Sequence, residues 1–242
     1  MPARISPQGR NRISDATAGG SGVGRSTGSG AGASGREVGA VFAVDATQTA
    51  GAMPIDVEAL GIDALVVHCY KCMLASYGLG FVVLCERFAG GEPLEEGWLV
   101  RDGSENFAAL VDYQDAYAGG MRRYDTSLRS NGMLVDMLGA ACELLLEWRP
   151  ERIRDYLLGI EAGFAQRLAA SGFGIAAPAD RAANHFGVRL PPGLAPDAVR
   201  EALAARRIRV SVRGSSVRVA PHVFNDEADL ARLATALEAL AD

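Results

Sequence analysis

The hydrophobic pattern along the chain changes abruptly near residue 37. Residues 1–36 are mainly Gly, Ser, Ala and Arg with almost no large apolar side chain, and such a segment cannot bury enough surface to offset the entropy of ordering. Continuous apolar runs of strand length follow at residues 38–44, in a run that ends near His68, and at residues 79–85. Such runs are typical of strands buried on both faces of a parallel sheet. We therefore predict a disordered tail followed by a mainly parallel sheet.

The second half of the chain has apolar residues at helical spacing over residues 131–148 and 150–171. Pro150 marks the junction, so the pattern predicts two long helices. The remaining residues read as a strand, a helix over residues 196–207, two short strands and a final helix. Asn225 is the predicted N-cap of that last helix, because acidic residues follow it in the first turn. This end of the chain is therefore expected to form a small α+β domain.

Taken together, the elements predict an α/β fold. The chain has 242 residues, of which 49% are hydrophobic, and this is enough to bury a core. The predicted division is a tail at residues 1–36, a large domain with a mainly parallel sheet at 37–130, and interdomain helices with the small domain at 131–242.

The charge balance narrows the classes of partner. The formal net charge is −5, so the chain as a whole does not attract nucleic acid phosphates or anionic lipid. No apolar run approaches the roughly 18 to 20 residues of a membrane span, and the first residues lack the apolar core of a signal peptide. We expect a cytoplasmic protein whose partners are small molecules or proteins, with no nucleic acid and no membrane.

The four cysteines form no evenly spaced framework, which fits free thiols in a reducing compartment. Cys69 and Cys72 make a C-x-x-C pair, but no second pair or histidine cluster accompanies it. A structural metal site needs about four such ligands, so the sequence predicts no metal.

Lys71 is the only lysine among the 24 lysine and arginine residues. Arginine replaces lysine in ion pairs and on solvated surfaces, but its guanidinium stays protonated and cannot attack an aldehyde as an amine. A lysine retained in such a composition is either a chance survivor on the surface or a residue whose amine is needed. Its neighbours favour the second interpretation.

Asp45 and Lys71 both follow the ends of predicted buried strands. Ligands of open α/β sheets bind beyond the carboxyl ends of the strands, so the two side chains are candidates for one site. An enzyme that uses pyridoxal phosphate needs an amine to hold the cofactor and a carboxylate to keep the pyridine nitrogen protonated. Lys71 and Asp45 supply these two groups.

The residues around this pair resemble the cofactor-binding core of the class V aminotransferases, which are fold-type I pyridoxal phosphate enzymes. The resemblance is carried by Asp45-Ala-Thr-Gln48-Thr-Ala-Gly51, Asp56-Val, Asp63, His68-Cys-Tyr-Lys71 and Tyr77-Gly-Leu-Gly80, in that order. It implies that residues 37–130 are the remnant of a pyridoxal phosphate-binding large domain and that the C-terminal part is the family's small domain.

The resemblance also implies roles for individual residues. Lys71 would form the internal aldimine with pyridoxal 5'-phosphate, Asp45 would pair with the pyridinium nitrogen, and Gln48 would hydrogen-bond the ring's phenolic oxygen. Tyr70 and His68 stand at positions that help to hold the phosphate in relatives, and Tyr70 is the preferred candidate. The Tyr70-Lys71 pair resembles that of kynureninases.

Two further segments carry a looser resemblance. Residues 217–225 resemble the strand and turn whose arginine binds the substrate's α-carboxylate, which makes Arg218 the first candidate and Arg213 the reserve, since a guanidinium pairs with a carboxylate in two-point fashion. A second segment resembles the one through which a partner subunit reaches the phosphate in the family's dimers. This resemblance implies a homodimer. The residues that carry it are Tyr113, Arg122, Arg123, Tyr124, Asp125, Ser130 and Asn131.

The reaction within the family stays open. The family's desulfurases use a nucleophilic cysteine from the small domain, and no cysteine follows Cys142 here. Aminotransferase, β-lyase, kynureninase-like or epimerase-like chemistry on an amino acid therefore remains.

Three hypotheses remain for the chain as a whole. The resemblance begins at about residue 38, whereas in relatives a turn that cradles the phosphate and a side chain that stacks on the ring precede this point. The chain is therefore an active pyridoxal phosphate enzyme, a truncated and inactive remnant, or a non-catalytic partner of a full-length homologue.

Overall fold

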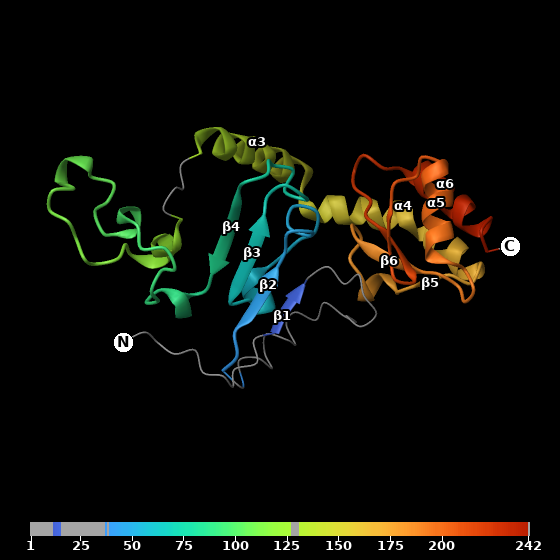
Figure 1. Cartoon of the computed structure of the whole chain (residues 1–242), viewed down its shortest axis with the longest axis horizontal. Coiled ribbons are helices and arrows are strands. Elements are labelled where there is room, and N and C mark those ends of the chain that lie inside the picture. The colour runs from blue at the N-terminus through green and yellow to red at the C-terminus, as the bar shows by residue number, and fades with distance from the viewer. Residues whose placement is uncertain (1–11, 16–36, 38, 127–130, 242) are drawn as a thin grey trace.

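A computed structural model describes residues 12–15, 37, 39–126 and 131–241. Its elements form two bodies joined by long helices (Figure 1). The first sheet has the order β1-β2-β3-β4, and the second has the order β5-β6-β8-β7.

In the first sheet, β1, β2 and β3 run parallel, and β4 runs antiparallel to β3. β2 (Phe42–Asp45) pairs in parallel with β3 (Ala64–His68), as the sequence predicts. β4 (Gly80–Leu84) pairs with β3 in the antiparallel sense, with Gly80 opposite His68. The connection between these two strands contains no helix, and a parallel return needs a crossover of a dozen or more residues.

β1 (Arg12–Asp15) pairs in parallel with β2 at the edge of the sheet. These four residues lie within the segment expected to be a disordered tail, so that expectation is wrong for them. The backbone hydrogen-bonding edge of β2 gives an extended segment a partner regardless of its side chains, which a composition argument does not take into account. The rest of the predicted tail lies outside the described residues.

Only one face of the first sheet packs against a core. Leu65 and Val67 are buried in β3, while Val66 and His68 between and after them are exposed. In β4, Val82 is exposed at 51% of its surface. The expectation of strands buried on both faces is therefore wrong for β3 and β4, because no described element covers this second face. The packed face contains Val44, Ala46, Ala50, Ile62, Leu65 and Val67.

A short helix and a set of 3-10 turns complete the first body. α2 (Val57–Leu60) is capped by the Asp56 side chain, which accepts from the Ala59 amide, and it ends at Gly61. The 3-10 turns of this part are η1 (Glu86–Phe88), η2 (Trp98–Val100), η3 (Phe107–Ala109) and η4 (Gly120–Tyr124). Figure 1 shows the segment that carries these turns projecting from the first sheet on the side away from the small domain.

The two predicted long helices are confirmed. α3 (Gly132–Trp148) begins at Asn131, whose side chain accepts a hydrogen bond from the Leu134 amide. α4 (Pro150–Ala170) begins at the proline, as predicted, because proline fits the first position of a helix, where no amide hydrogen is needed. α4 runs from the first body into the small domain (Figure 1).

The small domain is an antiparallel sheet covered by helices. Its strands are β5 (Gly174–Ile175), β6 (Phe186–Arg189), β7 (Ser211–Arg213) and β8 (Ser216–Val219); its helical elements are η5 (Pro178–Asp180), α5 (Pro196–Ala205) and α6 (Glu227–Glu238). The N-cap of α6 is Asp226, not Asn225. The Asp226 carboxylate accepts from the Asp229 amide, whereas the Asn225 side chain turns back and accepts from the His222 amide.

Candidate active site

The turn after β2 is tied to the end of β3. The Ala46 amide donates to the Val66 carbonyl over 2.9 Å, and the amides of Thr49 and Ala50 both donate to the Ala46 carbonyl. The Thr47 hydroxyl accepts a hydrogen bond from the His68 amide at 3.0 Å. The carboxyl ends of the two parallel strands are therefore held together, as the sequence argument expects.

Asp45 stands at the end of β2 within this arrangement. Its carboxylate accepts from the Thr47 amide at 2.9 Å. Partial burial raises the pKa of Asp45, but the hydrogen bonds from Thr47 and the nearby positive charges of His68 and Lys71 together bring this pKa below its usual value. Asp45 is therefore ionised at neutral pH, as a partner for a protonated ring nitrogen has to be.

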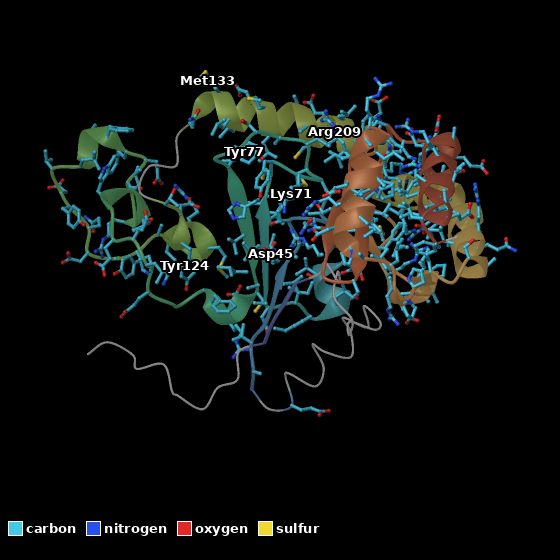
Figure 2. The ribbon with its side chains drawn as sticks, turned by 45° about the vertical axis from the view of Figure 1, so that its right-hand side comes forward. Asp45, Lys71, Tyr77, Tyr124, Met133 and Arg209 are labelled. Atoms are coloured by element: carbon cyan, nitrogen blue, oxygen red, sulfur yellow. The ribbon has the colours of Figure 1, made fainter. Side chains whose placement is uncertain are left out.

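Lys71 lies in a tight turn just beyond β3, with its side chain exposed. The Leu74 amide donates to the Lys71 carbonyl, and the Ala75 amide donates to the Cys69 carbonyl. The amine Nζ lies 5.5 Å from the centre of the Tyr70 ring. Figure 2 labels both residues: Asp45 is the last residue of β2, and Lys71 follows the end of β3.

The two candidates for phosphate binding lie beside Lys71. The Tyr70 ring stacks on the Tyr77 ring with centroids 4.2 Å apart and planes inclined by 17°. The His68 ring is tilted against Tyr70 at 6.2 Å. The stack holds the Tyr70 ring next to Lys71. The sequence gives no reason to expect this contact, because Tyr77 is recognisable there only as the first residue of the Tyr-Gly-Leu-Gly turn.

The small domain contributes Arg218 to this region. Arg218, in β8, donates a hydrogen bond to the side-chain oxygen Oε1 of Gln48. The first candidate for substrate binding and a candidate for cofactor binding are thus in direct contact across the two bodies, although 170 positions separate them in the sequence. Arg213 lies on the edge strand β7 with its side chain exposed.

Asn184 and Cys72 also contact Gln48, and neither is predicted as a site residue from the sequence. The Asn184 side chain donates from Nδ2 to the Gln48 backbone carbonyl at 2.6 Å and lies 3.4 Å from Cys72 Sγ. The Cys72 thiol donates to the same carbonyl at 3.1 Å. Burial raises the pKa of Cys72, although Asn184 and Lys71 act in the opposite direction, so the thiol keeps its proton and remains a donor.

The segment that resembles a dimer contact is held by hydrogen bonds to nearby backbone. The Arg123 guanidinium donates to the carbonyls of Gly91 and Ala118, at 3.1 and 3.3 Å. The Tyr124 hydroxyl donates to the Phe88 carbonyl at 2.6 Å. Tyr113 is exposed, and Arg122 and Asp125 lie on the same projecting segment. Asn131 caps α3, and Ser130 lies outside the described residues.

Solved structures share this architecture at low sequence identity. A cysteine desulfurase from Thermococcus onnurineus NA1 superposes with a TM-score of 0.74 at 21% identity, over 95% of this chain and 59% of its own. An alanine–glyoxylate aminotransferase from Nostoc sp. gives a TM-score of 0.63 at 20% identity, over 88% and 57%. The chain therefore has the fold-type I architecture, of which it covers a part.

The chain belongs to the class V aminotransferase family, since the family's sequence model, described as Aminotransferase class-V, matches residues 29–237. A curated relative, the uncharacterized aminotransferase YcbU of Bacillus subtilis (strain 168), is 27% identical over 201 residues. That match covers 79% of this chain and 49% of the relative, so the chain spans about half the length of the relative.

Proposed function

We propose that this chain binds pyridoxal 5'-phosphate at Lys71 and acts on an amino acid in the manner of the class V aminotransferases. The observation that carries the proposal is an ionised Asp45 at the end of β2 together with Lys71 just beyond the end of β3, the adjacent parallel strand. When bound, pyridoxal phosphate supplies an aldehyde that reacts with amines and a ring that accepts electrons. An amine and an ionised carboxylate are the two groups that such a cofactor requires.

Each nearby residue has a role that its chemistry allows. Lys71 holds the cofactor through its amine, and Asp45 keeps the ring nitrogen protonated by accepting its hydrogen bond. Gln48 offers its amide Nε2 to the ring's phenolic oxygen, because Arg218 already donates to Oε1. The Tyr70 hydroxyl, with His68 as the second donor, contributes to phosphate binding.

Arg218 is the proposed partner of the substrate's carboxylate. Its guanidinium can bind a carboxylate with two parallel hydrogen bonds, and it lies beside the cofactor residue Gln48. Arg213 is the weaker candidate because its exposed position on the edge strand carries no such link. The proposed reaction is an amino-acid transamination, with lyase or epimerase chemistry as the alternatives, in a cytoplasmic homodimer.

The second candidate function is that of an inactive remnant or non-catalytic partner of a full-length homologue. The uncovered face of the first sheet supports it, because Val66 and Val82, which lie opposite each other in β3 and β4, are exposed there, and exposed apolar patches mark places where another surface packs. Co-purification of a longer homologue with the tagged chain from its native cells would favour this candidate.

Titration with pyridoxal phosphate tests the first proposal. The wild-type chain should develop the absorption band of a lysine-bound cofactor. The Lys71→Ala variant should not develop it, and Lys71→Arg is the matched control because it keeps the positive charge but has no reactive amine. A wild-type chain without a band, or a Lys71→Arg variant with the wild-type band, contradicts the proposal.

A further inference from the structure

The Gln48 backbone carbonyl is satisfied by side chains from outside its own turn. Within residues 46–53, the backbone hydrogen bonds of the turn end on the carbonyls of Ala46 and Thr49. The Gln48 carbonyl instead accepts from Cys72 Sγ and from Asn184 Nδ2. Buried carbonyls need a partner, so these two side chains are part of what fixes the turn.

Asn184 makes this contact from a position with little freedom. It is 4% exposed and lies just before β6, in a loop closed by a bridge between Ala182 and His185. Its bond to the Gln48 carbonyl is the shorter of the two, at 2.6 Å against 3.1 Å for the Cys72 thiol. Thiols are also weak donors, so the Asn184 amide is the main partner of this carbonyl.

Gln48 is therefore held at both its backbone and its side chain by the small domain. Asn184 binds the carbonyl, while Arg218 binds Oε1. Arg218 lies on β8, and Asn184 lies just before β6, the strand that pairs with β8; Gly187 of β6 is opposite Arg218. A guanidinium only donates hydrogen bonds, so the contact fixes the orientation of the Gln48 amide and turns Nε2 away from Arg218.

We propose that Asn184 is a positioning residue, which clamps the small domain to the turn after β2 and thereby holds Gln48 in the orientation that binds the cofactor ring. This inference rests on the proposed function. Asn184 touches Gln48 and Cys72, and it acts on the cofactor through Gln48. Loss of its amide leaves the Gln48 carbonyl with the weaker thiol donor and loosens the turn.

Hydrogen exchange in the cofactor-free chain tests the clamp directly. The Asn184→Ala variant should exchange the amides of residues 46–53 about three- to tenfold faster than wild type, as expected for the loss of one hydrogen bond. Asn184→Asp should do the same, since an ionised carboxylate cannot donate. Asn225→Ala is the matched control: it removes an asparagine of the small domain that bonds to His222 and Asp229 instead of Gln48, and it should leave this exchange unchanged.

The second donor provides a test that spares Asn184. Cys72→Ser keeps a hydroxyl donor and should preserve the wild-type exchange, whereas Cys72→Ala should raise it by less than Asn184→Ala does. If Asn184→Ala does not fold, Asn184→Asp keeps the inference testable. Wild-type exchange rates in Asn184→Ala, or in Asn184→Asp where the alanine variant does not fold, overturn the clamp.

Equilibrium binding of pyridoxal phosphate separates this inference from the proposed function. Asn184→Ala should bind the cofactor about three- to tenfold more weakly than wild type and shift its absorption maximum. Equal affinity and an unchanged spectrum in wild type and Asn184→Ala overturn the positioning role alone. If wild type itself fails to bind, the proposed function and the cofactor role of Asn184 both fall, and the exchange data still decide whether the clamp exists.

Discussion

Removal of Glu161 should destabilise the chain strongly. Glu161, in α4, forms an ion pair with Arg181 over 2.5 Å, and the two side chains are 1% and 4% exposed. The Arg181 guanidinium also donates to the Ala176 carbonyl at 3.0 Å and lies 4.4 Å from the centre of the Phe186 ring. In Glu161→Ala these two contacts remain, but a buried positive charge has lost its counter-charge.

The size of the loss follows from this environment. Breaking one side of a buried ion pair costs about 3–5 kcal/mol, because the remaining charge is left uncompensated. For a chain of this size, each kcal/mol corresponds to roughly 2–4 °C in Tm, so the expected decrease is about 6–20 °C. Glu161→Gln keeps an acceptor for Arg181 and should cost less than Glu161→Ala.

Unfolding in urea and a thermal melt measure both quantities. The double variant Glu161→Met, Arg181→Met is the decisive comparison, because apolar side chains of similar length remove both charges together. It should recover most of the stability that Glu161→Ala loses. A loss below about 1 kcal/mol in Glu161→Ala, or a double variant less stable than the single one, would refute the reasoning.

Three other predictions concern single residues. Burial lowers the pKa of His222, whose ring nitrogens have no hydrogen-bond partner among the described residues. The folded state therefore loses stability as the pH falls below the ordinary histidine pKa, by at most about 1.4 kcal/mol per pH unit. His222→Gln should flatten this part of a urea-unfolding pH profile. Gly51→Ala should cost about 1–3 kcal/mol in the same assay, since Gly51 has a φ of 92° and an added Cβ would lie 2.5 Å from the Cys72 carbonyl oxygen; an unchanged midpoint would show that the two turns do not approach so closely. Asp45→Asn should weaken pyridoxal phosphate binding about tenfold or more, because a neutral amide cannot balance a protonated ring nitrogen, and equal affinity in a titration would remove Asp45 from the site.

The positions of Asp45 and Lys71 could be predicted because the information is local. Each follows an apolar run, and parallel strands bring their carboxyl ends to one edge of a sheet. Pro150 likewise set the junction between α3 and α4 from sequence alone. These features depend on residues within a few positions of each other, where the pattern of side chains is informative.

Other features depend on distant contacts that a single sequence does not encode visibly. The direction of β4 follows from its short connection, and the exposure of Val66 depends on which elements cover the sheet. Asn184 contacts Gln48 across 136 positions, and an isolated asparagine before a strand has no pattern that marks such a contact. The N-cap of α6 moved by one residue because Asn225 has a second use at the His222 amide.

The measurement that tests the central claim most directly is reduction of the cofactor-treated chain with borohydride, followed by peptide mapping. Lys71 is the only lysine of the sequence, so its Nζ and the N-terminal amine are the two primary amines that pyridoxal phosphate can modify. The account predicts a reduced adduct on the peptide containing Lys71 and no adduct there in Lys71→Arg. An adduct confined to the N-terminal amine, or no adduct in the wild-type chain, would contradict it.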